Sequence, residues 1–205
     1  MKSRGAFIVL EGPDKSGKST QAALLARHLK SRGIAFLHTR EPGGTSFAEA
    51  IRRILLNPKN KVGALAELLL YEAARAQHTQ EKLIPALRAG KVVLSERYTL
   101  ATLAYQGYAR GLSLPLIRRL NAIATGGLAP DLTIVLDIPE SEFGSRDRAR
   151  RRDRLELEPA RFRRLVREGY RALARRERGV ATLNGRLGVS ALHREILRLV
   201  EPFLR

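Results

Sequence analysis

The sequence predicts an α/β fold in which a five-stranded parallel sheet carries helices on both faces. Short apolar runs alternate with segments of helical periodicity, which is typical of parallel strands joined by helices. A glycine-rich loop of the phosphate-binding type joins the first apolar run to the first helical segment. The 205 residues suffice for one medium-sized domain, so we expect residues 1–205 to form a single unit.

The strands and helices are predicted from apolar periodicity and from residues that end helices. Strands are expected at residues 6–11, 34–38, 91–95, 132–137 and 180–184. Helices are expected at residues 19–32, 46–56, 64–87, 115–124, 161–176 and 191–204. Gly33 follows the first helix, and Asn57 and Pro58 end the second. The run at 132–137 is apolar almost throughout, which indicates a strand buried on both faces.

Composition and charge limit the class of protein. No stretch approaches the ~20 apolar residues of a membrane span, and residues 1–5 lead directly into a strand. We therefore expect a soluble, cytoplasmic protein with no membrane partner. Cysteine is absent, which excludes disulfides, thiolate zinc sites and cysteine nucleophiles. The formal net charge of +18 favours phosphorylated or polyanionic partners.

The strongest motif is the pattern GxxxxGK[ST], which lies between a predicted strand and a predicted helix. We expect its residues to bind ATP: Gly12, Pro13, Asp14, Lys15, Ser16, Gly17, Lys18, Ser19 and Thr20. Gly12 and Gly17 let backbone N–H groups face inward, where the helix N-terminus adds positive partial charge. Lys18 is expected to reach the β- and γ-phosphates, and Ser19 to bind Mg²⁺.

Two further motifs follow predicted strands, at the carboxyl edge where α/β sheets bind ligands. The hexapeptide REPGGT, which begins at Arg40, follows the second strand, and Glu96-Arg97-Tyr98 follows the third. Arg40 and Arg97 suit a second phosphate group, and Glu96 suits Mg²⁺ or its water. Taken alone, the Pro-Gly-Gly run is as compatible with an ordinary loop as with a binding site. For Glu96 and Arg97 the alternative is a surface ion pair.

Four segments in order and spacing resemble thymidylate kinases over about residues 7–170. They are GPDKSGKST, REPGGT, ERY with TLATLAYQGYARGL after it, and PDLTIVLD followed by an arginine-rich segment ending in DRLE. The resemblance implies a P-loop nucleoside monophosphate kinase that transfers the γ-phosphoryl group of ATP to dTMP. It also implies Mg²⁺ on the donor phosphates and a homodimer packed through helices.

The resemblance implies roles for individual side chains. Asp14 would contact the acceptor sugar, Tyr71 would stack on thymine, and Arg75, on the same helix face, would recognise the base. Tyr105 would exclude a ribose 2′-hydroxyl, and Thr102 would read the thymine edge. The expected dTMP-binding residues are Asp14, Arg40, Tyr71, Arg75, Arg97, Thr102, Tyr105 and Gln106.

The arginine-rich segment at about residues 144–156 resembles the lid that closes over the triphosphate in these kinases. Its cations would stabilise charge on the transferring group, although a solvated basic surface is the alternative interpretation. Lys15 and the lid arginines are both candidates for the critical cation. The expected catalytic residues are Lys18, Arg97, Glu96, Asp14, Lys15, Arg146, Arg148, Arg150 and Arg154.

Three residues depart from the usual pattern of the family. Glu96 stands where the family usually has Asp, Tyr71 where it usually has Phe, and Ala101 where a small polar residue is common. The longer Glu96 side chain would shift a metal by about an ångström.

Two alternative functions remain open from the sequence. One is that of another nucleotide or nucleoside kinase, and the other is that of a P-loop protein that binds nucleic acid. Because no nucleic-acid motif is recognisable, we expect no nucleic-acid partner.

Overall fold

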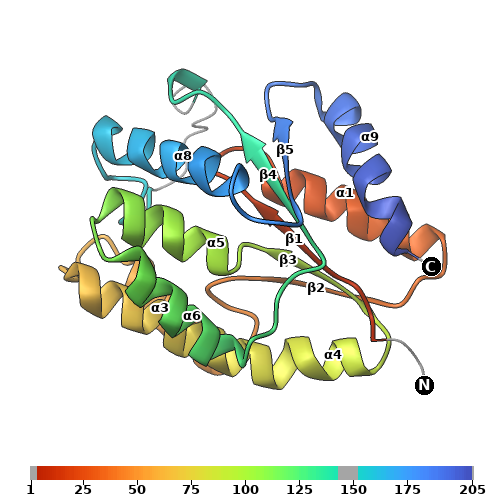
Figure 1. Cartoon of the computed structure of the whole chain (residues 1–205), viewed down its shortest axis with the longest axis horizontal. Helices are drawn as coiled ribbons and strands as arrows, with labels where there is room; N and C mark the ends of the chain where they lie inside the picture. The colour runs from red at the N-terminus through yellow and green to blue at the C-terminus, as the bar shows by residue number, and fades with distance from the viewer. Residues whose placement is uncertain (1–3, 143–151, 205) are drawn as a thin grey trace.

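The computed structural model describes residues 4–142 and 152–204 and is built around one parallel sheet (Figure 1). The sheet has five strands in the order β2-β3-β1-β4-β5. The strands are β1 (Phe7–Glu11), β2 (Phe36–Arg40), β3 (Val92–Glu96), β4 (Leu132–Asp137) and β5 (Val180–Asn184). The predicted α/β class, the strand number and the parallel direction are confirmed.

Helices connect the strands and end close to the predicted positions. They are α1 (Lys18–Ser31), α2 (Ser46–Leu56), α3 (Ala64–His78), α4 (Ile84–Arg88), α5 (Thr99–Thr102), α6 (Leu114–Thr125), α8 (Ala160–Ala174) and α9 (Val189–Val200). Two π-helical segments, η1 (Thr79–Leu83) and η2 (Leu103–Ala109), and a 3₁₀ turn, η3 (Glu201–Phe203), complete the described elements.

The two faces of the sheet bury different sets of helices, because successive side chains of a strand point in opposite directions. In β1, Ile8 and Leu10 pack in one cluster with side chains of α1 and α9. Phe7 and Val9 pack in another cluster with Leu83 of η1 and with α4. Figure 1 shows α1 and α9 together on one side of the sheet, with α3, α4 and α6 on the other.

Three local differences from the sequence prediction have physical causes. The helix predicted at 64–87 is interrupted by η1, just before Pro85, which has no N–H to continue the regular hydrogen-bond pattern. The second strand begins two residues later than expected, because Ile34 still donates its N–H to Leu29 O at the end of α1. The helical run formed by α5 and η2 was not predicted.

Helix α8 approaches η2 very closely at Gly169. A Cβ built on Gly169 would lie 2.9 Å from Cβ of Tyr108, which is nearer than real Cβ atoms come to another side chain. Glycine at this position therefore sets the spacing between α8 and η2, and it is followed directly by Tyr170, which is 1% exposed.

The carboxyl ends of β1, β2 and β3 meet at one edge of the sheet. Leu10 of β1 pairs with Glu96 of β3, and Arg40 of β2 pairs with the same Glu96. The chain that follows each strand therefore leaves from the same edge, which brings the phosphate loop, the REPGGT segment and Arg97 together.

Candidate active site

The phosphate loop wraps its backbone around the ammonium group of Lys18. Gly12 and Gly17 have φ values of 134° and 96°, which disfavour residues with a Cβ. Lys18 Nζ donates to Gly12 O at 3.0 Å and to Pro13 O at 2.7 Å, and it lies 3.4 Å from Ser16 Oγ. Burial, together with the charge of Arg97, lowers the pKa of Lys18 to about 7.

A hydroxyl and a carboxylate meet at the start of α1. Ser19 Oγ donates to Glu96 Oε2 at 2.5 Å, and His38 Nε2 lies 3.1 Å from Glu96 Oε1. Although burial alone would raise it, the pKa of Glu96 lies below its ordinary value because of its hydrogen bonds with His38 and Ser19. Hard oxygen ligands of this kind suit Mg²⁺, which usually keeps water and phosphate oxygens as its other ligands.

A metal ion at Ser19 and Glu96 would be held jointly by the protein and by a bound polyphosphate. In residues 4–142 and 152–204, no three His, Cys, Asp or Glu side chains cluster as a metal site of their own. A divalent ion held by Ser19 and Glu96 would therefore take most of its ligands from a bound polyphosphate and from water.

Arg97 lies at the centre of the polar network. Its NH1 group donates to Gly12 O and to Tyr170 Oη, both at 3.0 Å. Its NH2 group donates to Tyr105 Oη at 3.1 Å and to the carboxylate of Asp14. Tyr105 Oη in turn donates to Asp14 Oδ2 at 3.0 Å. Burial would raise the pKa of Asp14, but Arg97 and Lys18 bring it below its ordinary value.

Two adjoining cavities open around this network. The larger, about 1500 Å³, is lined by Asp14, Lys15, Gly17, Lys18, Ser19, Thr20, Arg40, Glu41, Arg52, Glu96, Arg97, Asp153 and Glu156. The smaller, about 470 Å³, is lined by Asp14, Glu41, Pro42, Arg52, Leu56, Tyr71, Arg97, Ala101, Thr102, Tyr105, Gln106, Asp153 and Leu155. Five residues line both: Asp14, Glu41, Arg52, Arg97 and Asp153. Two ligands could therefore meet at Arg97.

The residues predicted to bind dTMP fall into four groups. Tyr71, Thr102, Tyr105 and Gln106 line the smaller cavity, and Arg40 lines only the larger one. Asp14 and Arg97 line both. Arg75 lines neither, and its role at the base stays a prediction.

Arg75 is instead the centre of a buried polar cluster, with only 2% of its surface exposed. It donates to Glu41 Oε2, Glu72 Oε1 and Asn121 Oδ1, each at 2.8 Å, and to Tyr98 O at 3.1 Å. Its NH1 group also lies 3.4 Å from Thr102 Oγ1, so Arg75 stands directly behind a wall of the smaller cavity.

The cations predicted for the lid fall partly outside the described chain. Arg146, Arg148 and Arg150 lie outside the described residues, whereas Lys15 lines the larger cavity. Arg154 lines neither of the two cavities. It donates from Nε to Leu55 O at 2.7 Å and from NH2 to Glu67 Oε2 at 2.5 Å.

Several site residues were missed by sequence reasoning. Arg52 lines both cavities and donates to Pro42 O at 2.8 Å. Its only signal was a charged residue beside apolar Ile51 in an amphipathic helix. Asp153 and Glu156 belong to the DRLE motif and line the larger cavity, whereas the residue predicted from that motif was Arg154.

The fold and the two adjoining cavities define the class of protein to which this chain belongs. A phosphate loop with an enclosed lysine binds a nucleoside triphosphate, and a second cavity that shares an arginine and a carboxylate with it admits a smaller anionic acceptor. This is the arrangement of a P-loop kinase that acts on a small phosphorylated molecule.

Comparison with known proteins narrows the class. The family model described as thymidylate kinase matches residues 10–196. The thymidylate kinase of Caldanaerobacter subterraneus subsp. tengcongensis is 43% identical, over 98% of each chain. That of Carboxydothermus hydrogenoformans is 50% identical, over 85% of this chain and 87% of its own. The crystal structure of thymidylate kinase from Ehrlichia chaffeensis has a TM-score of 0.80 at 29% identity, covering 96% of this chain and 99% of the other.

These matches confirm the resemblance seen in the motifs. The chain belongs to the thymidylate kinase family, ATP-dependent phosphotransferases that convert dTMP to dTDP.

Proposed function

We propose that residues 1–205 act as one kinase domain that binds ATP in the larger cavity and dTMP in the smaller. The observation that carries this assignment is the pair of adjoining cavities with Asp14 and Arg97 on their shared wall. A phosphate of the acceptor placed beside Arg97 would face the loop that surrounds Lys18. The donor and acceptor groups would then meet where both cations are within reach.

Positioning and charge neutralisation account for the proposed chemistry. Loop N–H groups and Lys18 hold the β- and γ-phosphates, and Arg97 neutralises charge on the acceptor phosphate and on the transferring group. The acceptor phosphate oxygen is already an anion, so no side chain has to remove a proton from it. Asp14, whose carboxylate is kept ionised beside Arg97, would accept a hydrogen bond from the acceptor sugar.

Ser19 and Glu96 are the residues that would hold Mg²⁺. Their hydroxyl and carboxylate oxygens lie at the start of α1, beside the loop that takes the phosphates. When bound, Mg²⁺ neutralises charge on the donor phosphates.

Selection of dTMP is assigned to the walls of the smaller cavity. Tyr71 presents a ring to the base, and Thr102 and Gln106 present polar groups to it. Arg75, which lies behind that wall, would contribute through Thr102. The REPGGT residue Arg40, which lines only the larger cavity, would act on the phosphates.

A coupled ADP-release assay across a panel of nucleoside monophosphates tests the proposed function. We expect the highest kcat/KM with dTMP. Preference for another monophosphate would identify a different nucleotide kinase. ADP release that no monophosphate accelerates would contradict a kinase function, and salt-dependent binding to nucleic acid in the same preparation would then favour the polyanion-binding alternative.

Tyr105 is predicted to discriminate against the ribonucleotide. Its ring packs edge-on against Phe162 and Tyr170, which fixes its position in the smaller cavity. Tyr105→Ala should lower the ratio of kcat/KM for dTMP to that for the ribose analogue by about tenfold, because the steric barrier is removed. Tyr105→Phe is the matched control: it keeps the ring and should keep most of the ratio. An unchanged ratio in Tyr105→Ala would remove the ring from sugar selection.

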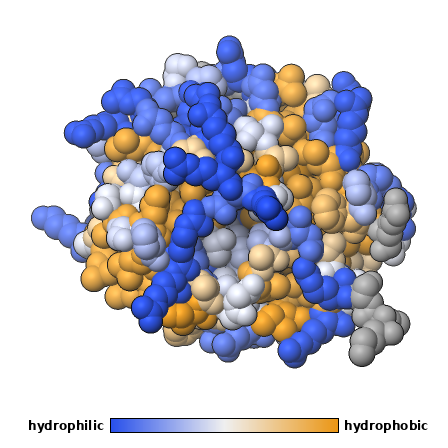
Figure 2. Space-filling model, in the orientation of Figure 1, coloured by the Kyte–Doolittle hydropathy of each residue, from blue (hydrophilic) through white to orange (hydrophobic). Residues whose placement is uncertain are grey.

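We propose that two copies associate through α2, α3 and α6. These neighbouring helices carry apolar side chains that are 41–69% exposed: Phe47, Ile54, Leu65, Leu69, Leu116 and Ile123. Figure 2 shows hydrophobic surface between hydrophilic side chains on the side where α3 and α6 lie in Figure 1. Exposed apolar groups on adjacent helices are typical of a homodimer interface.

Leu69→Glu is expected to convert the dimer to a monomer, because a carboxylate would be buried without a partner at the interface. Light scattering after size exclusion should show the molar mass fall by half. Val189→Glu on α9, which changes a similarly exposed residue, should leave the mass unchanged. A monomeric wild-type protein would refute the proposal.

No helix in the described parts of the chain, 4–142 and 152–204, is long and apolar enough to cross a membrane. A cytoplasmic location is part of the proposal, since the enzyme would draw on cytoplasmic nucleotide pools.

A further inference from the structure

Glu11, the last residue of β1, is a fully buried carboxylate that lines neither of the two cavities. Its Oε1 atom accepts from the N–H groups of Tyr98 at 2.8 Å and Ala101 at 3.2 Å. Its Oε2 atom accepts from Tyr170 Oη at 2.8 Å. Burial raises the pKa of Glu11, while Arg97 and these hydrogen bonds oppose the rise. Because all three partners donate, they match the ionised form of the side chain.

The backbone of Arg97 adopts a conformation that a non-glycine residue seldom adopts. Its φ of 71° lies in the left-handed region, which is unfavourable for a residue with a Cβ. Hydrogen bonds hold this turn on both sides: Arg97 N–H donates to Leu10 O at 2.9 Å, and Ser95 Oγ donates to Arg97 O at 2.8 Å. The next N–H, that of Tyr98, donates to Glu11. Glu11 therefore stabilises the turn that carries Arg97.

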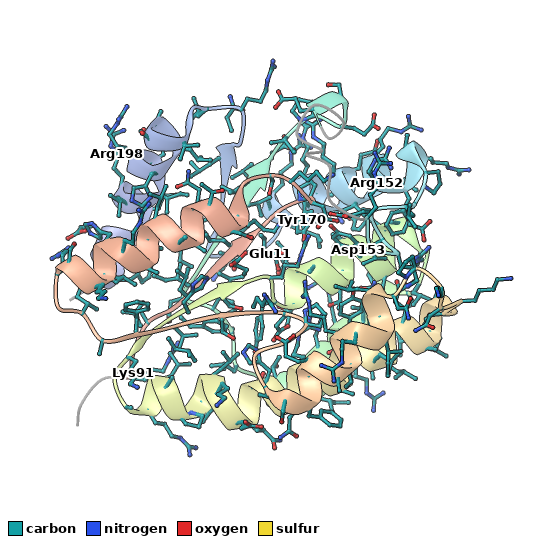
Figure 3. All side chains as sticks on the ribbon, turned by 180° about the vertical axis from the view of Figure 1, so that it is seen from behind. Glu11, Lys91, Arg152, Asp153, Tyr170 and Arg198 are labelled. Atoms are coloured by element: carbon teal, nitrogen blue, oxygen red, sulfur yellow. The ribbon has the colours of Figure 1, made fainter. Side chains whose placement is uncertain are left out.

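The guanidinium of Arg97 is connected to the same carboxylate through Tyr170. Arg97 NH1 donates to Tyr170 Oη at 3.0 Å, and this hydroxyl donates its single proton to Glu11. The lone pairs of the hydroxyl are then available to Arg97. Figure 3 shows Glu11 and Tyr170 side by side near the centre of the molecule.

We propose that Glu11 and Tyr170 are positioning residues for Arg97, one holding its backbone turn and both holding its guanidinium. Neither lines a ligand cavity, so each acts through Arg97 rather than on a substrate. The inference rests on the proposed function, in which Arg97 neutralises the acceptor phosphate. Loss of either contact should therefore weaken use of dTMP more than use of ATP.

Tyr170→Phe and Tyr98→Phe form a matched pair that tests this inference. Both tyrosines are 1% exposed, and each loses one buried hydroxyl, which for Tyr98 donates to Leu128 O at 3.1 Å. Tyr170→Phe should lower kcat/KM for dTMP by about tenfold, with KM for ATP changed less than about twofold. Tyr98→Phe should change kcat/KM for dTMP less than about twofold. An equal fall in melting temperature in both variants, with kcat/KM for dTMP unchanged, would indicate that the Tyr170 hydroxyl has a structural role only.

Two further variants test whether the effect passes through Arg97. Glu11→Gln keeps the side-chain volume but offers an amide N–H to Tyr170 Oη, so it should resemble Tyr170→Phe. In an Arg97→Lys background, a single ammonium nitrogen replaces the two guanidinium nitrogens that meet Tyr170 and Asp14, and Tyr170→Phe should add less than about a twofold loss. The inference is overturned if Tyr170→Phe matches Tyr98→Phe in kcat/KM for dTMP, or if its full effect persists beside Arg97→Lys.

The assay of wild-type protein across the nucleoside monophosphates distinguishes failure of the proposed function from failure of the positioning inference. If wild-type protein does not phosphorylate dTMP, the proposed function fails. If it does, and Tyr170→Phe is kinetically silent, only the positioning inference fails.

Discussion

Lys18→Ala is expected to lower kcat by at least about a thousandfold while the fold remains intact. The ammonium group is enclosed by the carbonyl groups of Gly12 and Pro13, at the place where donor phosphates would lie. Charge that develops during transfer would be left without its nearest cation. The coupled ADP-release assay at saturating ATP and dTMP measures the loss.

A lysine elsewhere in the same helix provides the control. Lys30 lies near the end of α1 and is exposed, so Lys30→Ala should retain full turnover. Circular dichroism of both variants should match that of the wild type. Near-normal turnover of a folded Lys18→Ala protein would show that the loop lysine is not the catalytic cation.

Arg75→Ala is expected to reduce the free energy of unfolding by ~3–5 kcal/mol, because Glu41 and Glu72 would lose their buried cationic partner. For a chain of this length the melting temperature should fall by roughly 10 °C. The measurement is a thermal or urea unfolding curve without ligands. Folded protein at low temperature should then be assayed for KM with dTMP.

Arg27→Ala, a change at an exposed arginine of α1, away from the helices of the proposed interface, is the control and should leave the melting temperature within about 2 °C. The two measurements separate the roles of Arg75. A large rise in KM with wild-type stability would show that Arg75 serves base recognition and not the buried cluster. A loss of stability with little change in KM would show the reverse.

Motifs whose chemistry is local were predictable from the sequence. The phosphate loop needs two glycines, a lysine and a helix start within a few residues, and all of these are contiguous from Gly12 to Thr20. The central strands β1, β3 and β4 were equally readable, because parallel strands buried on both faces are apolar along most of their length. These features set the edge of the sheet at which the cavities form.

Contacts between distant segments were not predictable in the same way. Arg154 was expected at the phosphates, but its partner Glu67 lies 87 positions away, on α3. Helical spacing predicted that Tyr71 and Arg75 share one face of α3 and address one ligand, and only Tyr71 lines the smaller cavity. The spacing says nothing of the carboxylates that surround Arg75. Glu11 gave no signal, since it meets Tyr170 across 159 positions of sequence.

The contact between Gly169 and Tyr108 bears on how this chain can vary over evolutionary time. A methyl group at position 169 would meet the Tyr108 side chain at 2.9–3.0 Å, so one helix would have to move. The neighbouring residue, Tyr170, carries the hydroxyl that meets Arg97. Mutational tolerance at this glycine is therefore limited by the spacing of two helices, although the residue touches no ligand cavity. Only a second glycine, at position 108, would relax that limit, because every other residue keeps the Cβ atom that lies 2.9 Å away.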